Sequence, residues 1–158
     1  MSYALSKFRE IRAAIVAELS GLSELPGGVH DARVKPFSES IDEYPVASVF
    51  TGNDSAEYSP DDANLRRDYD VDIVVISKGY DVADIASADD SFIEACDIAT
   101  AAIENALTKF RFTLDGLIYR LTYRRSSQVI DEDGEYFTCI RILTYNAHSI
   151  EKVVNANV

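Results

Sequence analysis

The feature that most constrains this chain is an amphipathic helix predicted over residues 89–109. Apolar residues recur there at spacings of four, three, four, three and four, which is the period of one face of an α-helix. The stripe consists of Phe92, Cys96, Ala99, Ile103, Ala106 and Phe110, widened by Ile93 and Leu107. Ser87 and Asp90 fit a capping box at its start. A stripe this wide requires an apolar surface to pack against.

Alternating patterns predict a sheet that offers such a surface. The clearest strand covers residues 65–77, where odd-numbered residues are mostly apolar and even-numbered ones from Arg66 to Asp72 are charged. Further strands are predicted at residues 29–37, 46–51, 117–124 and 136–147.

The order of elements is a helix over residues 4–20, three strands, the second helix and two strands. This order predicts the α+β class, with a mixed or antiparallel sheet of about four to five strands and both helices packed on one face. With 158 residues, the chain can bury a core without disulfides or metals. We assign residues 1–148 to a single domain and residues 149–158 to a frayed C-terminal tail.

Two acidic segments separate the strand patterns. Residues 54–64 carry four acidic side chains around Pro60, which predicts an exposed loop or a long hairpin tip. Residues 126–135 end in an acidic run with Asp133-Gly134, which is typical of the turn of an antiparallel hairpin.

The net charge of the chain argues against two classes of binding partner. The chain has 27 acidic and 15 basic side chains, a formal net charge of −12. This sign argues against a general binder of the nucleic-acid backbone and against docking on anionic lipid. No apolar run approaches the roughly 20 residues of a membrane span, and charged residues interrupt the N-terminal stretch where a signal peptide is apolar. We therefore expect a cytoplasmic setting.

Residues suited to catalysis are few and scattered. Neither His30 nor His148 has a neighbour at a metal-binding spacing. Cys96 and Cys139 lie in apolar patterns, so both thiols are expected to be buried and unreactive. The acidic residues of segment 54–62 lack the spacing of a calcium loop, and no glycine-rich phosphate loop is present. We expect no enzymatic activity and no cofactor.

Charge is unevenly distributed along the chain. Residues 81–97 hold six acids and no Lys or Arg, whereas residues 109–125 hold five basic residues and one acid. Arg66 and Arg67 form a second basic pair. Separate acidic and basic patches allow a protein to pair with copies of itself.

Four stretches carry a family resemblance. In chain order they are IRAAIVAEL, EYPVASVFTGNDSAEY, RRDYDVDIVVIS and LTYRRSSQVIDEDGEYFTCIRILTYNA. Their order and spacing, which cover most of residues 5–147, resemble the tail terminator proteins of long-tailed phages, the family that includes the minor tail protein U of lambda-like phages.

The resemblance implies a non-enzymatic subunit that assembles into a hexameric ring. Such a ring caps the last ring of the major tail tube protein, stops tube polymerisation and offers its other face to the head–tail connector protein. The implied location is the head-proximal end of the tail in the virion, and the host cytoplasm during assembly. Acidic crowding in the ring further predicts that a divalent cation such as magnesium favours assembly.

We expect charged residues to form the contact with neighbouring subunits or with the tube. The candidates are Arg66, Arg67, Arg120, Arg124, Arg125, Asp61, Asp62, Asp131 and Asp133. Arginine suits such contacts because its planar guanidinium binds a carboxylate through two parallel hydrogen bonds. Residues 53–66 and 126–135 are expected to become ordered only on assembly.

Three alternatives stay open at this point. A neck or head–tail connector protein would share the habit of forming rings. An acidic inhibitor that mimics nucleic acid would fit the net charge of −12, although the basic stretch at residues 109–125 counts against it. A small hydrolase would need a metal site that the residue spacings do not reveal.

Overall fold

The computed structural model describes residues 7–32, 43–59, 64–80, 91–108, 113–114, 116–133 and 136–152. Its elements are α1 (Phe8–Leu19), β1 (Val29–Asp31), β2 (Val46–Ser59), β3 (Asn64–Tyr80), α2 (Ser91–Leu107), β4 (Arg120–Asp133) and β5 (Tyr136–Lys152). The strands form one sheet in the order β1-β2-β3-β5-β4, in which β1 runs parallel to β2 and all other neighbours are antiparallel. The predicted α+β class with a mixed sheet is confirmed.

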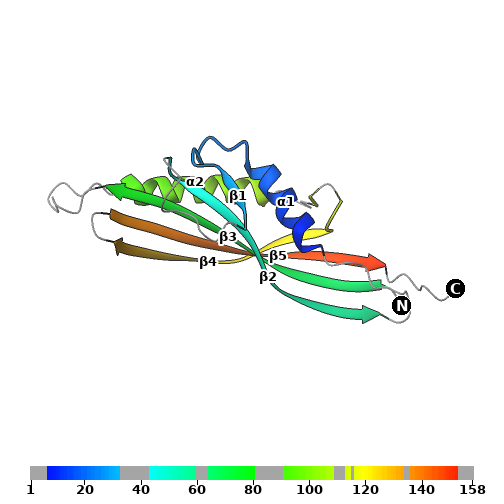
Figure 1. Ribbon diagram of the computed structural model, residues 1–158. Coiled ribbons are helices and arrows are strands. Elements are labelled where there is room, and N and C mark those ends of the chain that lie inside the picture. Colours follow the sequence, from blue (N-terminus) through cyan, green and yellow to red (C-terminus); the bar gives the residue numbers. More distant parts are fainter. Residues whose placement is uncertain are drawn as a thin grey trace.

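Both helices lie on one side of a strongly twisted sheet (Figure 1). Helix α1 packs over β1 and β2, and α2 packs over β3 and β5. We call this side of the sheet the helix face. The opposite side, which we call the open face, has no covering helix or strand among the described residues (Figure 1).

The core forms because one parity of the strands is apolar. Odd-numbered residues of β3 pair with odd-numbered residues of β5, so that Val71 lies opposite Tyr145 and Ile73 opposite Leu143. All four side chains are buried on the helix face. The predicted helical stripe meets them there, since the α2 residues Phe92, Cys96, Ala99, Ile103 and Leu107 are buried in the same cluster.

The strands are longer than their sequence patterns indicate. Of the segment predicted as an exposed loop or a long hairpin tip, residues 54–59 are the second half of β2, which pairs antiparallel with β3 up to Ser59 opposite Asn64. The segment predicted as a hairpin tip is mostly β4, which continues to Asp133. Cross-strand hydrogen bonding overrides the local loop composition in both places. Residues 53–59 and 126–133 are thus strand residues, and their ordering only on assembly stays a prediction.

Some predicted boundaries also differ. Strand β1 covers only Val29–Asp31, and the rest of the predicted strand at 29–37 lies outside the described residues from 33 onward. The capping pair Ser87 and Asp90 and the helix residue Phe110 are outside them too. Strand β5 reaches Lys152, five residues past the predicted end of the strand at 147, because β3 provides partners along this length.

Gly27 offers a direct test of the packing beside β2. Its N–H donates to the carbonyl oxygen of Pro45 at 3.0 Å, and an added Cβ would overlap the carbonyl oxygen of Glu43 and lie 2.8 Å from Cβ of Val46. Gly27→Ala is therefore expected to lower the free energy of unfolding by about 1–3 kcal/mol, as for other overpacked sites. Gly21→Ala is the control, because a Cβ there has nothing within 4 Å. Equal denaturant midpoints for the two variants would contradict this packing.

Candidate assembly surface

The open face carries a polar ladder along the pairing of β3 with β5. Even-numbered acids of β3 each accept a hydrogen bond from the residue opposite on β5. His148 Nδ1 lies 2.5 Å from Asp68 Oδ1, Asn146 Nδ2 donates to Asp70 at 2.5 Å, and Thr144 Oγ1 donates to Asp72 at 2.8 Å. The charged parity predicted for the strand at residues 65–77 thus faces away from the helices, and its three acids are hydrogen-bonded by β5.

Four arginines next to this ladder form no ion pair with an acid in the part of the chain that the structure describes. The ion pairs of the described residues use Arg12, Arg67, Arg141 and His148 as their cations. The exposed side chains of Arg66, Arg120, Arg124 and Arg125 form none with any described acid. A carboxylate of a partner that binds one of these four arginines therefore displaces no ion pair with a described acid.

The register places most of these arginines on the outermost strand. Arg120 lies opposite His148 and Arg125 opposite Thr144, so both share the open face with the ladder. Arg124 occupies a bulge between Tyr123 and Arg125, where the pairing with β5 shifts by one residue. A bulge increases local twist and redirects side chains at a sheet edge. The three arginines of the predicted basic edge, Arg120, Arg124 and Arg125, are thus all exposed on the outermost strand.

Two of the remaining predicted interface residues lie farther along the same strand. Asp131 is exposed near the far end of β4, and Asp133 lies in the same strand. Asp61 and Asp62 lie outside the described residues. Arg67 differs from its neighbour Arg66, because it points to the helix face and binds acids of its own chain.

Arg67 belongs to a buried network that residue patterns did not reveal. Tyr69 donates its hydroxyl proton to Glu151 Oε1 at 2.6 Å, and Arg67 lies 3.4 Å from Glu151 Oε2 and 2.8 Å from Asp54 Oδ2. Only 3% of Glu151 is exposed. Burial, followed by the hydrogen bond to Glu151, raises the pKa of Tyr69. The sequence predicts a frayed tail at Glu151, whereas the pairing of β5 with β3 places Glu151 opposite Leu65 and next to Tyr69 and Arg67.

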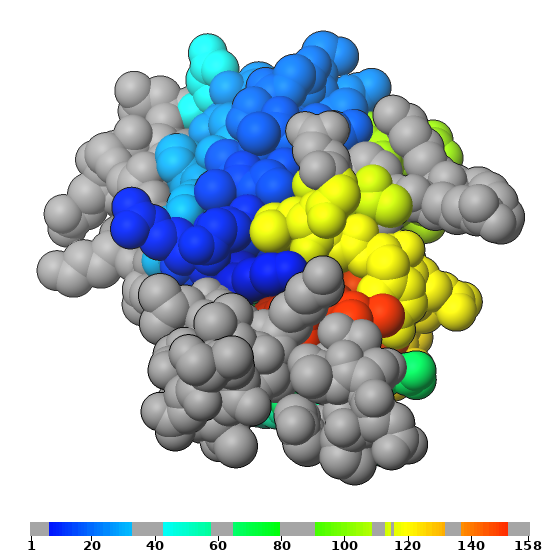
Figure 2. All heavy atoms as spheres, turned by 90° about the vertical axis from the view of Figure 1, so that its right-hand side faces the viewer, coloured from blue at the N-terminus to red at the C-terminus, as the bar shows by residue number. Residues whose placement is uncertain are grey.

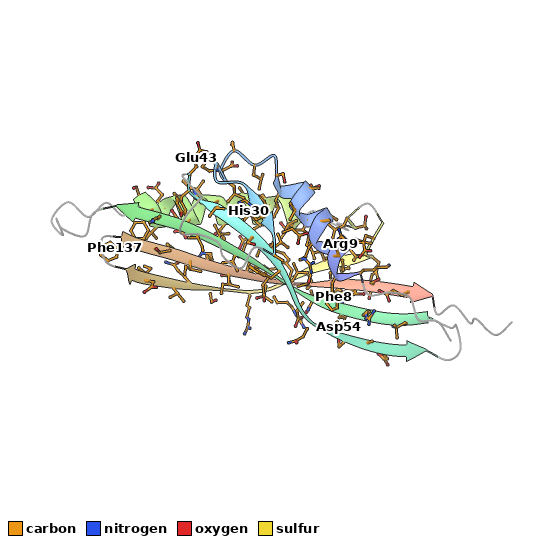
Figure 3. The ribbon with its side chains drawn as sticks, in the orientation of Figure 1. Phe8, Arg9, His30, Glu43, Asp54 and Phe137 are labelled. Carbon is orange, nitrogen blue, oxygen red and sulfur yellow. The ribbon has the colours of Figure 1, made fainter. Side chains whose placement is uncertain are left out.

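The start of α1 closes the same network. The backbone N–H of Lys7 donates to the Tyr69 hydroxyl at 3.0 Å, and its ammonium group donates to Leu117 O and Ser149 Oγ. Figure 2 shows this end of α1 (dark blue) against the segment before β4 (yellow) and the end of β5 (red). Phe8 packs edge-on against Tyr69, and Asp54 is the residue of β2 that pairs with Tyr69. Figure 3 labels Phe8 and Asp54. These contacts fasten the extended ends of β2, β3 and β5 to the core.

Removing one hydroxyl tests the network. Tyr69→Phe leaves the buried carboxylate of Glu151 without its shortest donor, so we expect the free energy of unfolding to fall by about 1–3 kcal/mol. Tyr123→Phe is the matched control, since Tyr123 is 41% exposed and its hydroxyl has no hydrogen-bond partner among the described residues. Chemical denaturation of both variants measures the difference. A Tyr69→Phe protein as stable as the control would show that Glu151 does not need this bond.

A shallow groove of about 420 Å³ crosses the open face beside the arginines. Its lining residues are Ser55, Ala56, Glu57, Arg66, Asp68, Tyr119 and His148. The lining mixes both charges, and the described part of the chain contains no group of three or more His, Cys, Asp or Glu side chains placed to hold a metal. Within that part, no helix is long and apolar enough to cross a membrane.

The two thiols lie together in the core and not on this surface. Cys96 of α2 and Cys139 of β5 are both fully buried, as expected, and the Cys96 sulfur is 4.0 Å from the Cys139 carbonyl oxygen. Burial, with a smaller effect of the neighbouring Cys139, raises the pKa of Cys96 to about 12. A thiol that stays protonated at neutral pH is a weak nucleophile.

The raised pKa of Cys96 predicts alkaline sensitivity. The unfolded chain loses this proton near pH 9.0, whereas the folded chain keeps it up to about pH 12. Unfolding therefore releases a proton between these values, and stability falls as pH rises through that window. The melting temperature should drop less steeply above pH 9 in Cys96→Ala than in the natural chain. Parallel slopes for the two proteins would contradict the assignment.

Comparison with known proteins gives a match of fold. No protein-family model matches the chain, and no curated protein matches it. Among solved structures, 29 chains match. One belongs to a structure titled "Virion of native gene transfer agent (GTA) particle"; it is 20% identical, with a TM-score of 0.51, and the match covers 95% of this chain and 99% of that one. At this identity the similarity establishes a shared fold over nearly the whole of both chains.

Proposed function

We propose that this chain is a structural subunit of a phage or phage-like virion and that it acts there as a tail terminator. The observation that carries the proposal is the shared fold with a chain of a gene transfer agent virion, which covers 95% of this chain. The sequence stretches that resemble tail terminators support the narrower role. In this role the subunit transforms no substrate, and its function resides in its contacts.

The free edges of the sheet support assembly into a ring. The outer edge of β4 has no neighbouring strand among the described residues, and β1 covers β2 only from Ala47 to Val49. The rest of β2, down to Ser59, has no neighbour on that side among the described strands. A rotation that brings one edge of a subunit against the other edge of the next makes a heterologous contact, and such contacts close into rings.

The two edges carry opposite charge at the same height on the sheet. The cross-strand register aligns Arg120 with Ser55 and Arg125 with Phe50, through β5 and β3. Asp54, which also binds Arg67, lies in this part of β2, and the exposed Glu57 lies two residues beyond Ser55. Strands β2 and β4 also run in opposite directions, so the adjoining edges of two rotated copies are antiparallel.

We assign the partners accordingly. Copies of the chain form a hexameric ring, one face of the ring binds the major tail tube protein, and the other binds the head–tail connector protein. The acidic surface of the chain, with a net charge of −12, makes a divalent cation such as magnesium favourable to assembly, because cations reduce repulsion between like-charged subunits.

Charge reversal at the basic edge tests the proposal. In the variant Arg124→Glu/Arg125→Glu, we expect loss of six-fold rings and of binding to purified tail tubes, with folding unchanged because both side chains are exposed. Ring formation is followed by sedimentation and electron microscopy, with magnesium and with a chelator. Arg9→Glu on α1 is the control, since Arg9 is an exposed arginine of a helix that packs over β1 and β2 and lies on a different element from this edge.

Two outcomes would count against the proposal in different ways. If the natural chain formed no rings and failed to bind tube ends with magnesium present, the terminator role would be wrong. If the double variant assembled as well as the natural chain, the ring would remain and the basic edge would lose its role.

A further inference from the structure

Strand β4 is an unprotected edge strand. Its described residues from Ser126 to Asp131 are exposed whichever face of the sheet they occupy. Val129 on the open face is 54% exposed, and Ile130 on the helix face is 50% exposed. Proteins usually block such an edge with proline, lysine or a bulge, and none of these lies between Ser126 and Asp131. A strand with these properties is suited to pair with another strand.

Two copies of β4 that pair antiparallel place opposite charges next to each other. Arg125 and Asp131 lie three residues on either side of Gln128. When two copies of β4 pair antiparallel about Gln128, Arg125 of each copy lies opposite Asp131 of the other. Arg125, Val129 and Asp131 share the open face, so residues paired in this register also lie on the same face.

The uncharged residues between them fit the same register. Ser126 lies opposite Ile130 of the second copy, and Ser127 lies opposite Val129. Each large apolar side chain therefore meets a small one, which avoids a clash of two β-branched side chains. Shifting the register by two residues toward the N-terminus would place Arg125 opposite Val129 and would lose both charge pairs.

We propose that the free protein forms a two-fold symmetric dimer in which β4 pairs antiparallel with β4 of a second copy. The axis passes beside Gln128, perpendicular to the sheet, so the helices of both copies lie on the same side. The two five-stranded sheets become continuous, and the unpaired backbone groups of both edges form hydrogen bonds. Two charge pairs and one stretch of paired strand make a small interface, so the dimer is a reversible one.

This dimer covers the edge that the proposed ring requires. The dimer itself does not depend on the terminator role, but the competition between dimer and ring rests on it. Because Arg124 and Arg125 cannot face β4 of a two-fold partner and β2 of a ring neighbour together, the dimer has to dissociate before a ring closes. Free subunits are thereby kept from forming rings away from a tube end.

A charge swap tests the pairing of Arg125 with Asp131. In Arg125→Glu or Asp131→Arg, like charges lie opposite each other at both ends of the interface, and we expect the dimer dissociation constant to rise by about tenfold or more. The double variant Arg125→Glu/Asp131→Arg restores both pairs with reversed polarity and should dimerise like the natural chain. Sedimentation equilibrium of the free chain, without tubes, gives the constants.

Cross-linking tests the two-fold axis itself. In the Gln128→Cys variant the two introduced thiols lie opposite each other, about 4.5–5.5 Å apart between Cα atoms, within the range for a disulfide. Ser126→Cys is the control, because it faces Ile130 of the other copy. Mild oxidation by a disulfide reagent should join Gln128→Cys chains and leave Ser126→Cys chains separate, while Cys96 and Cys139 stay buried.

The results separate the dimer from the ring. Any one of three results would overturn the dimer. The natural chain could be monomeric at every concentration, the double variant could fail to dimerise, or the two cysteine variants could cross-link equally. Restored dimers that still form no rings would be expected, because the glutamate that replaces Arg125 in the double variant repels the acidic edge of a ring neighbour. Natural dimers that never form rings on tubes would overturn the terminator role and leave the dimer standing.

Discussion

The structure depends on the pairing of β3 with β5 along their full described length. These two strands are joined from Asn64 opposite Lys152 to Tyr80 opposite Tyr136 without a shift of register. Since a strand has a period of two, this single register decides which side chains of both strands meet the helices and which lie on the open face. A slip by one residue would bring Asp68, Asp70 and Asp72 into the core.

The same register accounts for the division of charge. Acids of β3 on the open face are hydrogen-bonded by β5, and Arg67 on the helix face is bound by Asp54 and Glu151. Once these groups are satisfied within the chain, the arginines of the outer strand are left available to a partner. A protein with a strongly acidic composition can in this way present one basic edge.

The helices pack over β1, β2, β3 and β5, and this leaves β4 exposed. Helix α2 packs on β3 and β5, and the outer strand extends beyond it (Figure 1). Exposed strand edges are usually blocked in monomers, whereas a subunit that assembles by strand pairing needs at least one free edge. In the proposed scheme, β4 pairs either with β4 of a second copy or with β2 of a ring neighbour. Competition between these two partners provides a physical basis for controlling when assembly starts.

Local composition by itself determined much of this protein. The apolar stripe of α2, the alternation in β3 and the position of the arginines before residue 126 follow from side-chain period and charge, and these were predictable. The ends of the strands were not, because Asp54, Glu57 and Asp131 are typical of loops and become strand residues only through hydrogen bonds to distant partners. The buried position of Glu151 and the different surroundings of Arg66 and Arg67 were likewise decided by tertiary structure. Cross-strand pairing brings residues more than 80 positions apart into contact, and no local pattern records such a contact.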